Sequence, residues 1–215
     1  FDLGSNFFTK NSPVPVEKYN YMINMDMVGR LDADSTLAVF GVGTSPLFKQ
    51  VLNSSNSSFK LTLKDSGIGP SDHTSFYTND IPVLHFFTGQ HEDYHKPSDD
   101  YEKINFEGME KISSYIYDII SQLNNQGKLK FKKTINESEQ APRFNVTLGV
   151  IPDYLFDGVG MKIDGVSESR PAQKAGMLKG DIVVKMGNHK VNNMMDYMKA
   201  LSKFEKGEKT IVIIE

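Results

Sequence analysis

Cysteine is absent from this 215-residue sequence, which excludes disulfides, thiolate nucleophiles, iron–sulfur clusters and cysteine-ligated zinc. Any metal site must therefore use His, Asp or Glu. A basic surplus is absent too: 24 Lys and Arg stand against 27 Asp and Glu, which gives a net charge of −3 and argues against a nucleic-acid partner. No apolar run approaches the roughly 20 residues that cross a bilayer, so we expect no membrane span.

Hydrophobic residues make up 39% of the chain and aromatic residues 11%, enough for a packed core. The first residues, Phe1-Asp2-Leu3, include no initiator Met and no signal peptide, and the last six residues stop inside a strand-like run. We therefore expect the sequence to be a fragment of a longer chain. A polar, weakly periodic stretch at residues 126–143 indicates a linker between a first domain at 1–125 and a second domain at 144–215.

The first domain mixes strands that are apolar on both faces with helices, which predicts an α/β fold whose sheet is covered on both sides. The expected strands lie at residues 19–28, 36–42, 59–63 and 81–87, and the expected helices at 45–52 and 106–123. The second domain is short and β-rich. Its expected strands lie at residues 147–151, 160–166, 182–186 and 210–214, and its expected helices at 170–175 and 193–204.

Three segments contain residue types that could carry chemistry. Asp26 lies within an apolar run, where an ionised carboxylate is costly unless it is paired or binds a metal, although it could also cap a loop at the strand end. Residues 89–100, which follow a predicted strand, are dense in His, Asp and Glu and could bind a ligand or form a solvated loop. Asp72 and His73 could join a site or begin a short helix.

An acidic residue among apolar neighbours and a histidine-bearing loop after a strand together suggest a divalent metal such as zinc, which accepts imidazole nitrogen and carboxylate oxygen. Two ligands do not complete a zinc site, because catalytic zinc takes three protein ligands and a water.

Three motifs in order resemble the zinc aminopeptidases of peptidase family M28. They are Asn24-Met25-Asp26-Met27-Val28-Gly29-Arg30, Ser71-Asp72-His73-Thr74-Ser75-Phe76 and Tyr94-His95-Lys96-Pro97-Ser98-Asp99. The resemblance covers residues 1 to about 123 and implies a three-layer α/β/α sandwich of the zinc exopeptidase type, truncated here.

The resemblance also implies roles for individual residues. Asp26 and His95 would each bind a different one of two zinc ions, and Tyr94 would help to hold the tetrahedral intermediate. Asp72 and Asp99 would support the ligands from behind or shape the loops. Met27 and Phe87 would border the pocket for the first side chain of the substrate.

The same resemblance implies that part of the site is missing. The family's first His, its bridging Asp and its Glu-Glu pair lie upstream of a Leu-Gly-Ser stretch, which here is Leu3-Gly4-Ser5. Three of five ligands and the general base would then lie outside this chain. We expect the fragment to be inactive, to bind zinc weakly or not at all, and to expose sheet edges through which it could form a homo-oligomer.

The second domain resembles a bacterial PDZ domain. Thr147-Leu148-Gly149-Val150 is similar to a carboxylate-binding loop, and residues 169–183 are similar to the Pro-Ala-x-x-Ala-Gly-Leu-x-x-Gly-Asp signature of that fold. The amides of Leu148, Gly149 and Val150 would hold the terminal carboxylate of a peptide that adds a strand to the sheet edge. The alternative is a spacer or interdomain brace that binds no free peptide.

Together the two resemblances predict an aminopeptidase that acts on peptides, in the periplasm or secreted from a bacterium. Two alternatives stay open: a glutaminyl cyclase on the same fold, and a non-catalytic peptide-binding protein that has lost the site. Tyr94 before the ligand His and the attached PDZ domain favour the peptidase.

Overall fold

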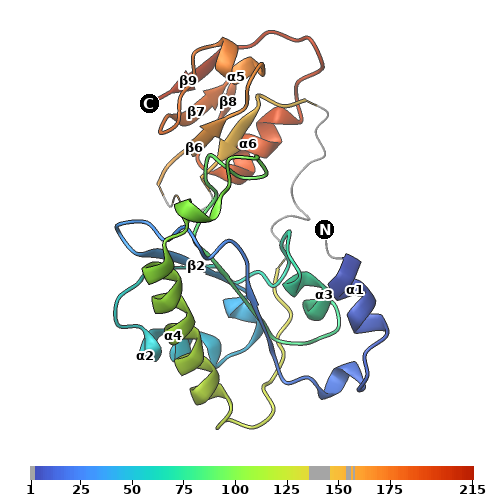
Figure 1. Ribbon diagram of the computed structural model, residues 1–215. Helices are drawn as coiled ribbons and strands as arrows, with labels where there is room; N and C mark the ends of the chain where they lie inside the picture. Colours follow the sequence, from blue (N-terminus) through green and yellow to red (C-terminus); the bar gives the residue numbers. More distant parts are fainter. Residues whose placement is uncertain (1–2, 136–145, 154–155, 157) are drawn as a thin grey trace. The chain divides into compact units, whose positions relative to one another are not determined.

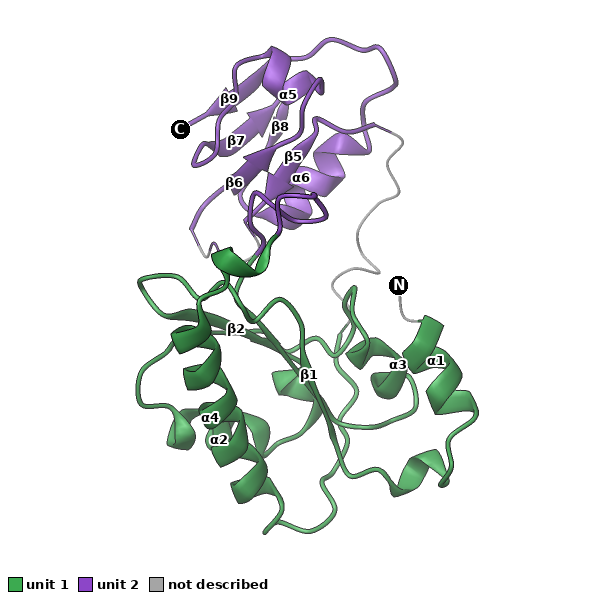
Figure 2. Cartoon of the chain, viewed as in Figure 1, with its two compact units in different colours: residues 1–89, 100–138 green, residues 90–99, 139–215 purple. Residues whose placement is uncertain are grey.

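The computed structural model describes residues 3–135, 146–153, 156 and 158–215 (Figure 1). It divides into two compact units (Figure 2). The first comprises Phe1–Gly89 and Asp100–Ser138, and the second comprises Gln90–Asp99 and Glu139–Glu215. Within the described residues, no helix is both long enough and apolar enough to span a bilayer.

A four-stranded mixed sheet forms the centre of the first unit. Its strands run in the order β1-β4-β2-β3, with β1 parallel to β4, β2 parallel to β3, and β2 antiparallel to β4. They are β1 (Met22–Met25), β2 (Thr36–Phe40), β3 (Lys60–Leu63) and β4 (Val83–Phe87). The strand expected at 19–28 is shorter than predicted because Met27 adopts a φ of 56°, which turns the chain out of the sheet.

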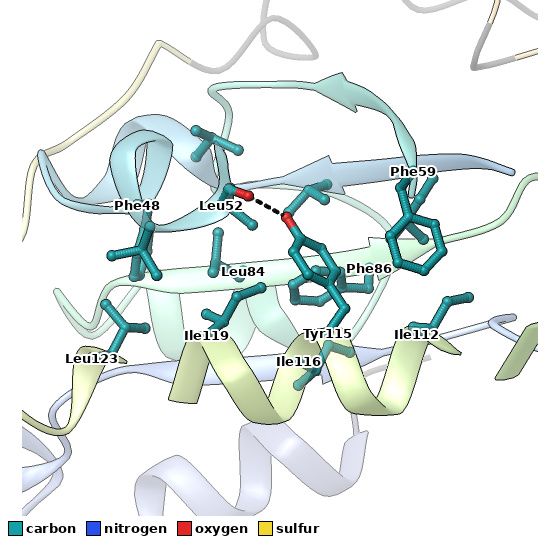
Figure 3. Close-up of a cluster of buried hydrophobic side chains, with 14 of the residues drawn as sticks. Phe48, Leu52, Phe59, Leu84, Phe86, Ile112, Tyr115, Ile116, Ile119 and Leu123 are labelled. Atoms are coloured by element: carbon teal, nitrogen blue, oxygen red, sulfur yellow. Dashed lines mark hydrogen bonds between the residues drawn. The ribbon is translucent and has the colours of Figure 1, made fainter. Parts of the chain in front are cut away.

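One face of this sheet carries the main apolar core. Alternate residues of β4, Leu84 and Phe86, are completely buried and point into a cluster with helices α2 (Phe48–Ser55) and α4 (Phe106–Leu123) (Figure 3). The α4 residues in this cluster recur at helical spacing: Ile112, Tyr115, Ile116, Ile119 and Leu123. The side chain of Asn105 caps α4 by accepting a hydrogen bond from the Gly108 amide at 2.9 Å.

The opposite face of the sheet carries two shorter helices, α1 (Leu3–Lys10) and α3 (His73–Tyr77). The intervening β4 residue, His85, faces this side and stacks on His73 of α3. Figures 1 and 2 show α2 and α4 on one side of the sheet and α1 and α3 on the other. The predicted α/β sandwich, with helices on both faces, is therefore confirmed.

Part of the predicted linker packs against the first unit. Residues 128–134 run along its surface, where the Leu129 amide donates to Asn20 Oδ1 at 2.7 Å and the Thr134 amide donates to the Tyr77 hydroxyl at 2.9 Å. Residues 136–145, which include the rest of that linker, lie outside the described residues. Residues 128–134 of the predicted linker therefore pack with the first unit, and the linker bounds stay a prediction.

The second unit contains a smaller antiparallel sheet with two helices. The strands run in the order β5-β6-β7-β8, and β9 also pairs with β7. The elements are β5 (Val150–Pro152), β6 (Met161–Val166), α5 (Pro171–Lys174), β7 (Ile182–Met186), β8 (His189–Lys190), α6 (Met194–Leu201) and β9 (Val212–Ile214). A second apolar cluster, which includes Met161, Ile163, Val183 and Tyr197, fills the space between sheet and helices.

Candidate functional site

Asp26 and Thr88 lie at one edge of the first unit's sheet. They directly follow the parallel strands β1 and β4, whose carboxyl ends meet at the same edge. The Asp26 amide donates to Phe86 O at 3.2 Å, and the Thr88 hydroxyl donates to the carbonyl oxygen of Met27. These bonds hold the turn in which Met27 has its positive φ, so the backbone that presents Asp26 is fixed on both sides.

A chain of side-chain hydrogen bonds runs from the sheet to the Asp26 carboxylate. The Ser71 hydroxyl donates to Asp26 Oδ2 at 2.7 Å. Asn24 Nδ2 donates to Ser71 Oγ at 2.7 Å and lies 3.0 Å from His85 Nδ1. Asn24 is 9% exposed, Ser71 8% and His85 6%, so this network is shielded from water.

His73 and His85 form a buried stacked pair beneath this network. Their ring centroids are 4.5 Å apart and their planes differ by 5°. Burial lowers the pKa of His73 to about 3, with the nearby His85 as the next cause, and burial lowers the pKa of His85 to about 4. Both rings are therefore neutral near pH 7. Among the described residues, neither ring nitrogen of His73 has a hydrogen-bond partner.

The other predicted residues of the first unit surround these groups. Asp72 is exposed at the N-cap position of α3, where its side chain makes no capping hydrogen bond. Phe87 is half-buried, with its ring 6.0 Å from that of His85 and 6.4 Å from that of Phe40. Met27 is half-buried beside Asp26. Their assigned roles, in support of the ligands and at the substrate pocket, remain predictions.

The loop at residues 90–99 groups with the second unit and is folded on itself. Tyr94 and His95 pack edge to face with ring centroids 4.1 Å apart, and His95 has a φ of 55°. His91 Nε2 lies 3.9 Å from Asp99 Oδ2, and the Ser98 hydroxyl donates to the buried Asp93 carboxylate at 2.7 Å. These contacts show an ordered loop. The pairing of His95 with Asp26 remains a prediction.

Zinc fits these donors in kind, because a carboxylate and an imidazole are both zinc ligands. The number of donors is too small, however. Within the described part of the chain, no three His, Cys, Asp or Glu side chains lie close enough together to hold a metal ion. Asp26 and His95 would be two members of a larger set.

The predicted carboxylate-binding loop of the second unit is held mainly by its backbone. Leu148 O accepts from the Ala172 amide and Gly149 O from the Ser167 amide, each at 2.8 Å. Gly149 has a φ of 77°, and a Cβ at this position would meet Arg170 Cβ at 2.1 Å, so only glycine fits. The Gly149 amide donates to Thr147 Oγ1 at 2.9 Å. Val150 begins β5, which lies at one end of the strand order.

Sequence reasoning assigned no role to Asn24 or Ser71, and it treated His85 as a core residue. His85 is indeed buried, yet it also contacts the network that reaches Asp26. One signal was available: Asn24 and Asp26 are polar residues two apart in an apolar strand, so they share a face. Ser71 could not be found this way, because it comes from a loop 45 residues away from Asp26.

Comparison with known proteins agrees with both resemblances. The sequence model of peptidase family M28 matches residues 2–120, and the model of a PDZ domain matches residues 137–214. A comparison with curated proteins gave no match.

Several solved structures are similar to part of the chain. The LapA aminopeptidase of Legionella pneumophila is 26% identical with a TM-score of 0.45, and the alignment covers 56% of this chain and 35% of that one. BSAP, a zinc aminopeptidase from Bacillus subtilis, is 22% identical with a TM-score of 0.48, and the alignment covers 60% of this chain and 33% of that one. An aminopeptidase from Aneurinibacillus sp. strain AM-1 is 21% identical with a TM-score of 0.42, and the alignment covers 63% of this chain and 32% of that one.

This chain thus spans about a third of the length of each of these enzymes. The family match alone extends over more than half of the 215 residues, and it contains all three motifs around Asp26, Ser71 and His95. The chain belongs to peptidase family M28 and carries a PDZ domain after its peptidase part.

Proposed function

We propose that the whole protein is a metal-dependent aminopeptidase that releases N-terminal residues from peptides. Family membership supports a peptidase. The observation that carries the proposal is the Asp26 carboxylate, which follows β1 at the carboxyl edge of the sheet and is held there by the Ser71 hydroxyl at 2.7 Å. A carboxylate fixed in this way is suited to bind a cation, because its orientation is set before the ion arrives.

In this proposal Asp26 and His95 bind zinc, two ions being expected in the whole enzyme, and the remaining ligands and the general base lie outside this sequence. Bound zinc supplies Lewis-acid polarisation of the peptide carbonyl. The Tyr94 hydroxyl donates a hydrogen bond to the oxygen that becomes negative as the carbonyl is attacked. Met27 and Phe87 border the pocket for the first side chain, while Asp72 and Asp99 support the loops. The 215-residue chain by itself is inactive.

The test uses the full-length protein with aminoacyl-anilide substrates and added zinc. We expect turnover by the wild type and a loss of at least about a thousandfold in His95→Ala, because a missing ligand removes the metal's contribution to the transition state. His189→Ala is the matched control, since His189 lies in β8 of the PDZ domain and outside the proposed site. Normal turnover by His95→Ala would overturn the assignment. Cyclisation of N-terminal glutamine without peptide cleavage would indicate a glutaminyl cyclase, and peptide binding without turnover a non-catalytic protein.

We also propose that the PDZ domain binds the C-termini of extended peptides. β5 lies at one end of its sheet, and the loop before it presents backbone groups next to Gly149. Calorimetry with a diverse set of C-terminal peptides should give binding that is lost when the peptide is amidated, because amidation removes the carboxylate. No binding across the set would support the role of an interdomain brace instead.

For location, we propose that the protein acts in the periplasm or outside a bacterial cell. The proposal rests on the combination of an M28 peptidase with a PDZ domain. Fractionation of expressing cells tests it, and recovery of the full-length protein only in the cytosolic fraction would contradict it.

A further inference from the structure

We infer that Asn24 is a positioning residue for Asp26, acting through the hydroxyl of Ser71. The inference rests on the proposed function, since it assumes that Asp26 binds the metal. Asn24 is a buried side chain on β1. In the network described above it bonds to Ser71 and not to the Asp26 carboxylate.

The direction of each hydrogen bond follows from the donors available. The Asn24 Nδ2 group has two hydrogens and no acceptor capacity, so it donates both to Ser71 Oγ at 2.7 Å and to His85 Nδ1 at 3.0 Å. Because Ser71 Oγ already accepts from Asn24, its single proton points to Asp26 Oδ2, 2.7 Å away. Asn24 thereby makes Ser71 a donor to Asp26.

His85 Nδ1, at the other end of the network, must act as an acceptor. His85 accepts at Nδ1 only as the neutral ring that carries its proton on Nε2. The parallel stack with His73, at 4.5 Å, holds the His85 ring plane. With His85 oriented in this way, the second hydrogen of Asn24 has a fixed partner, and the amide does not need to rotate away from Ser71.

The consequence falls on the Asp26 carboxylate. The Ser71 hydroxyl donates to Oδ2 and so fixes the orientation of the carboxylate. Oδ1 takes no part in this bond, and its direction is set by that orientation. Partners that orient a metal ligand in this manner typically change metal affinity or activity by about 10–100-fold when they are removed. A buried network of this kind is also stronger than the same bonds would be in water.

The first experiment measures zinc affinity of the full-length protein by competition with a chelator. We expect Asn24→Leu, which keeps the side-chain size and removes both donors, to weaken zinc binding about 10–100-fold. The matched control is Thr44→Val. Thr44 is also buried, and its hydroxyl donates to Gly41 O and Val83 O, away from the network. This variant should therefore lose stability and keep its zinc affinity.

A double-mutant cycle with Ser71→Ala tests the route of the effect. If Asn24 acts through Ser71, the double variant Asn24→Leu/Ser71→Ala should bind zinc about as tightly as Ser71→Ala alone. Losses that multiply in the double variant would overturn the inference, as would wild-type zinc affinity in Asn24→Leu.

A measurement without any variant covers the case in which Asn24→Leu does not fold. The ¹⁵N shifts of the His85 ring in the wild-type 215-residue chain should show Nδ1 unprotonated and Nε2 protonated near neutral pH. The opposite tautomer would overturn the inference, because Asn24 could then not donate to Nδ1.

The outcomes also separate this inference from the proposed function. If Asp26→Ala keeps full zinc affinity and turnover, the metal site assignment fails and the inference fails with it. If Asp26→Ala loses both while Asn24→Leu behaves as the wild type, only the inference fails.

Discussion

The first unit and the PDZ part of the second unit, from residue 146 onward, bury different kinds of side chain. In the first unit, polar groups such as Asn24, Ser71, His73 and His85 are at most 9% exposed and lie beside Asp26. Among the described residues from 146 onward, the buried side chains are apolar or aromatic. Burying a polar group lowers the stability of the fold unless the group makes its hydrogen bonds. The first unit thus holds polar groups in fixed directions at a cost in folding free energy.

The second unit arranges its candidate binding loop by backbone geometry. Carbonyl groups of Leu148 and Gly149 bond to amides of neighbouring segments, and a positive φ at Gly149 forms the turn. This difference matches the proposed roles: a charged ion needs oriented side chains, whereas an extended peptide needs a sheet edge and main-chain amides.

Acid should destabilise the first unit much more than the second. His73 and His85 have folded-state pKa values of about 3 and about 4. In the unfolded chain each titrates near 6.5, so below that pH the unfolded state binds more protons and the free energy of unfolding falls until the folded-state values are reached. Between pH 7.5 and pH 5 the loss should be about 2 kcal/mol for each ring. Hydrogen exchange of β4 and β7 amides at the two pH values measures the two units separately.

His73→Leu is the control for this pH effect. It removes one of the two titrating rings, so it should roughly halve the pH dependence in the first unit and leave the second unit unchanged. The only imidazole among the described residues from 146 onward is the exposed His189. An equal acid sensitivity of β4 and β7 would contradict the contrast between the units.

Gly149→Ala should destabilise the second unit by about 2 kcal/mol or more. A side chain at this φ of 77° is strained, and its Cβ would also meet Arg170 Cβ at 2.1 Å. Gly176→Ala is the matched control, because Gly176 has a φ of 80° but nothing within 4 Å of the added Cβ. It should cost about 1 kcal/mol. Urea unfolding of the two variants gives the difference, and equal losses would show that the Arg170 contact is relieved by movement.

Tyr115→Phe should cost the first unit about 1 kcal/mol. The Tyr115 hydroxyl donates to Leu52 O at 2.7 Å inside the apolar cluster, and burial raises the pKa of Tyr115 (Figure 3). Removing the hydroxyl leaves a buried carbonyl without that donor. The shift of the urea midpoint measures the loss, and Tyr117→Phe, on the exposed side of α4, should leave the midpoint unchanged.

Elements with a strong hydrophobic periodicity have the bounds that the sequence predicted. Local backbone preferences shifted the bounds of others. The bounds of α4 and β7 agree with the predicted residues 106–123 and 182–186. The helix expected at 45–52 begins instead at Phe48, because a residue before proline disfavours the helical region and Ser45 is extended. The sequence analysis did not predict α1 or the two-residue strand β8.

The sequence by itself indicated the α/β fold class, because strand and helix periods are local properties, and its short motifs carried the resemblance to the M28 and PDZ families. The roles of Asp26 and His95 as metal ligands are predictions from that resemblance. Only the tertiary structure decided that Asn24, Ser71 and His85 join one network at Asp26. Ser71 is 47 residues from Asn24, and His85 is 61 residues from it. Contacts over such separations depend on how strands pair and which face each side chain takes, and those are properties of the folded sheet.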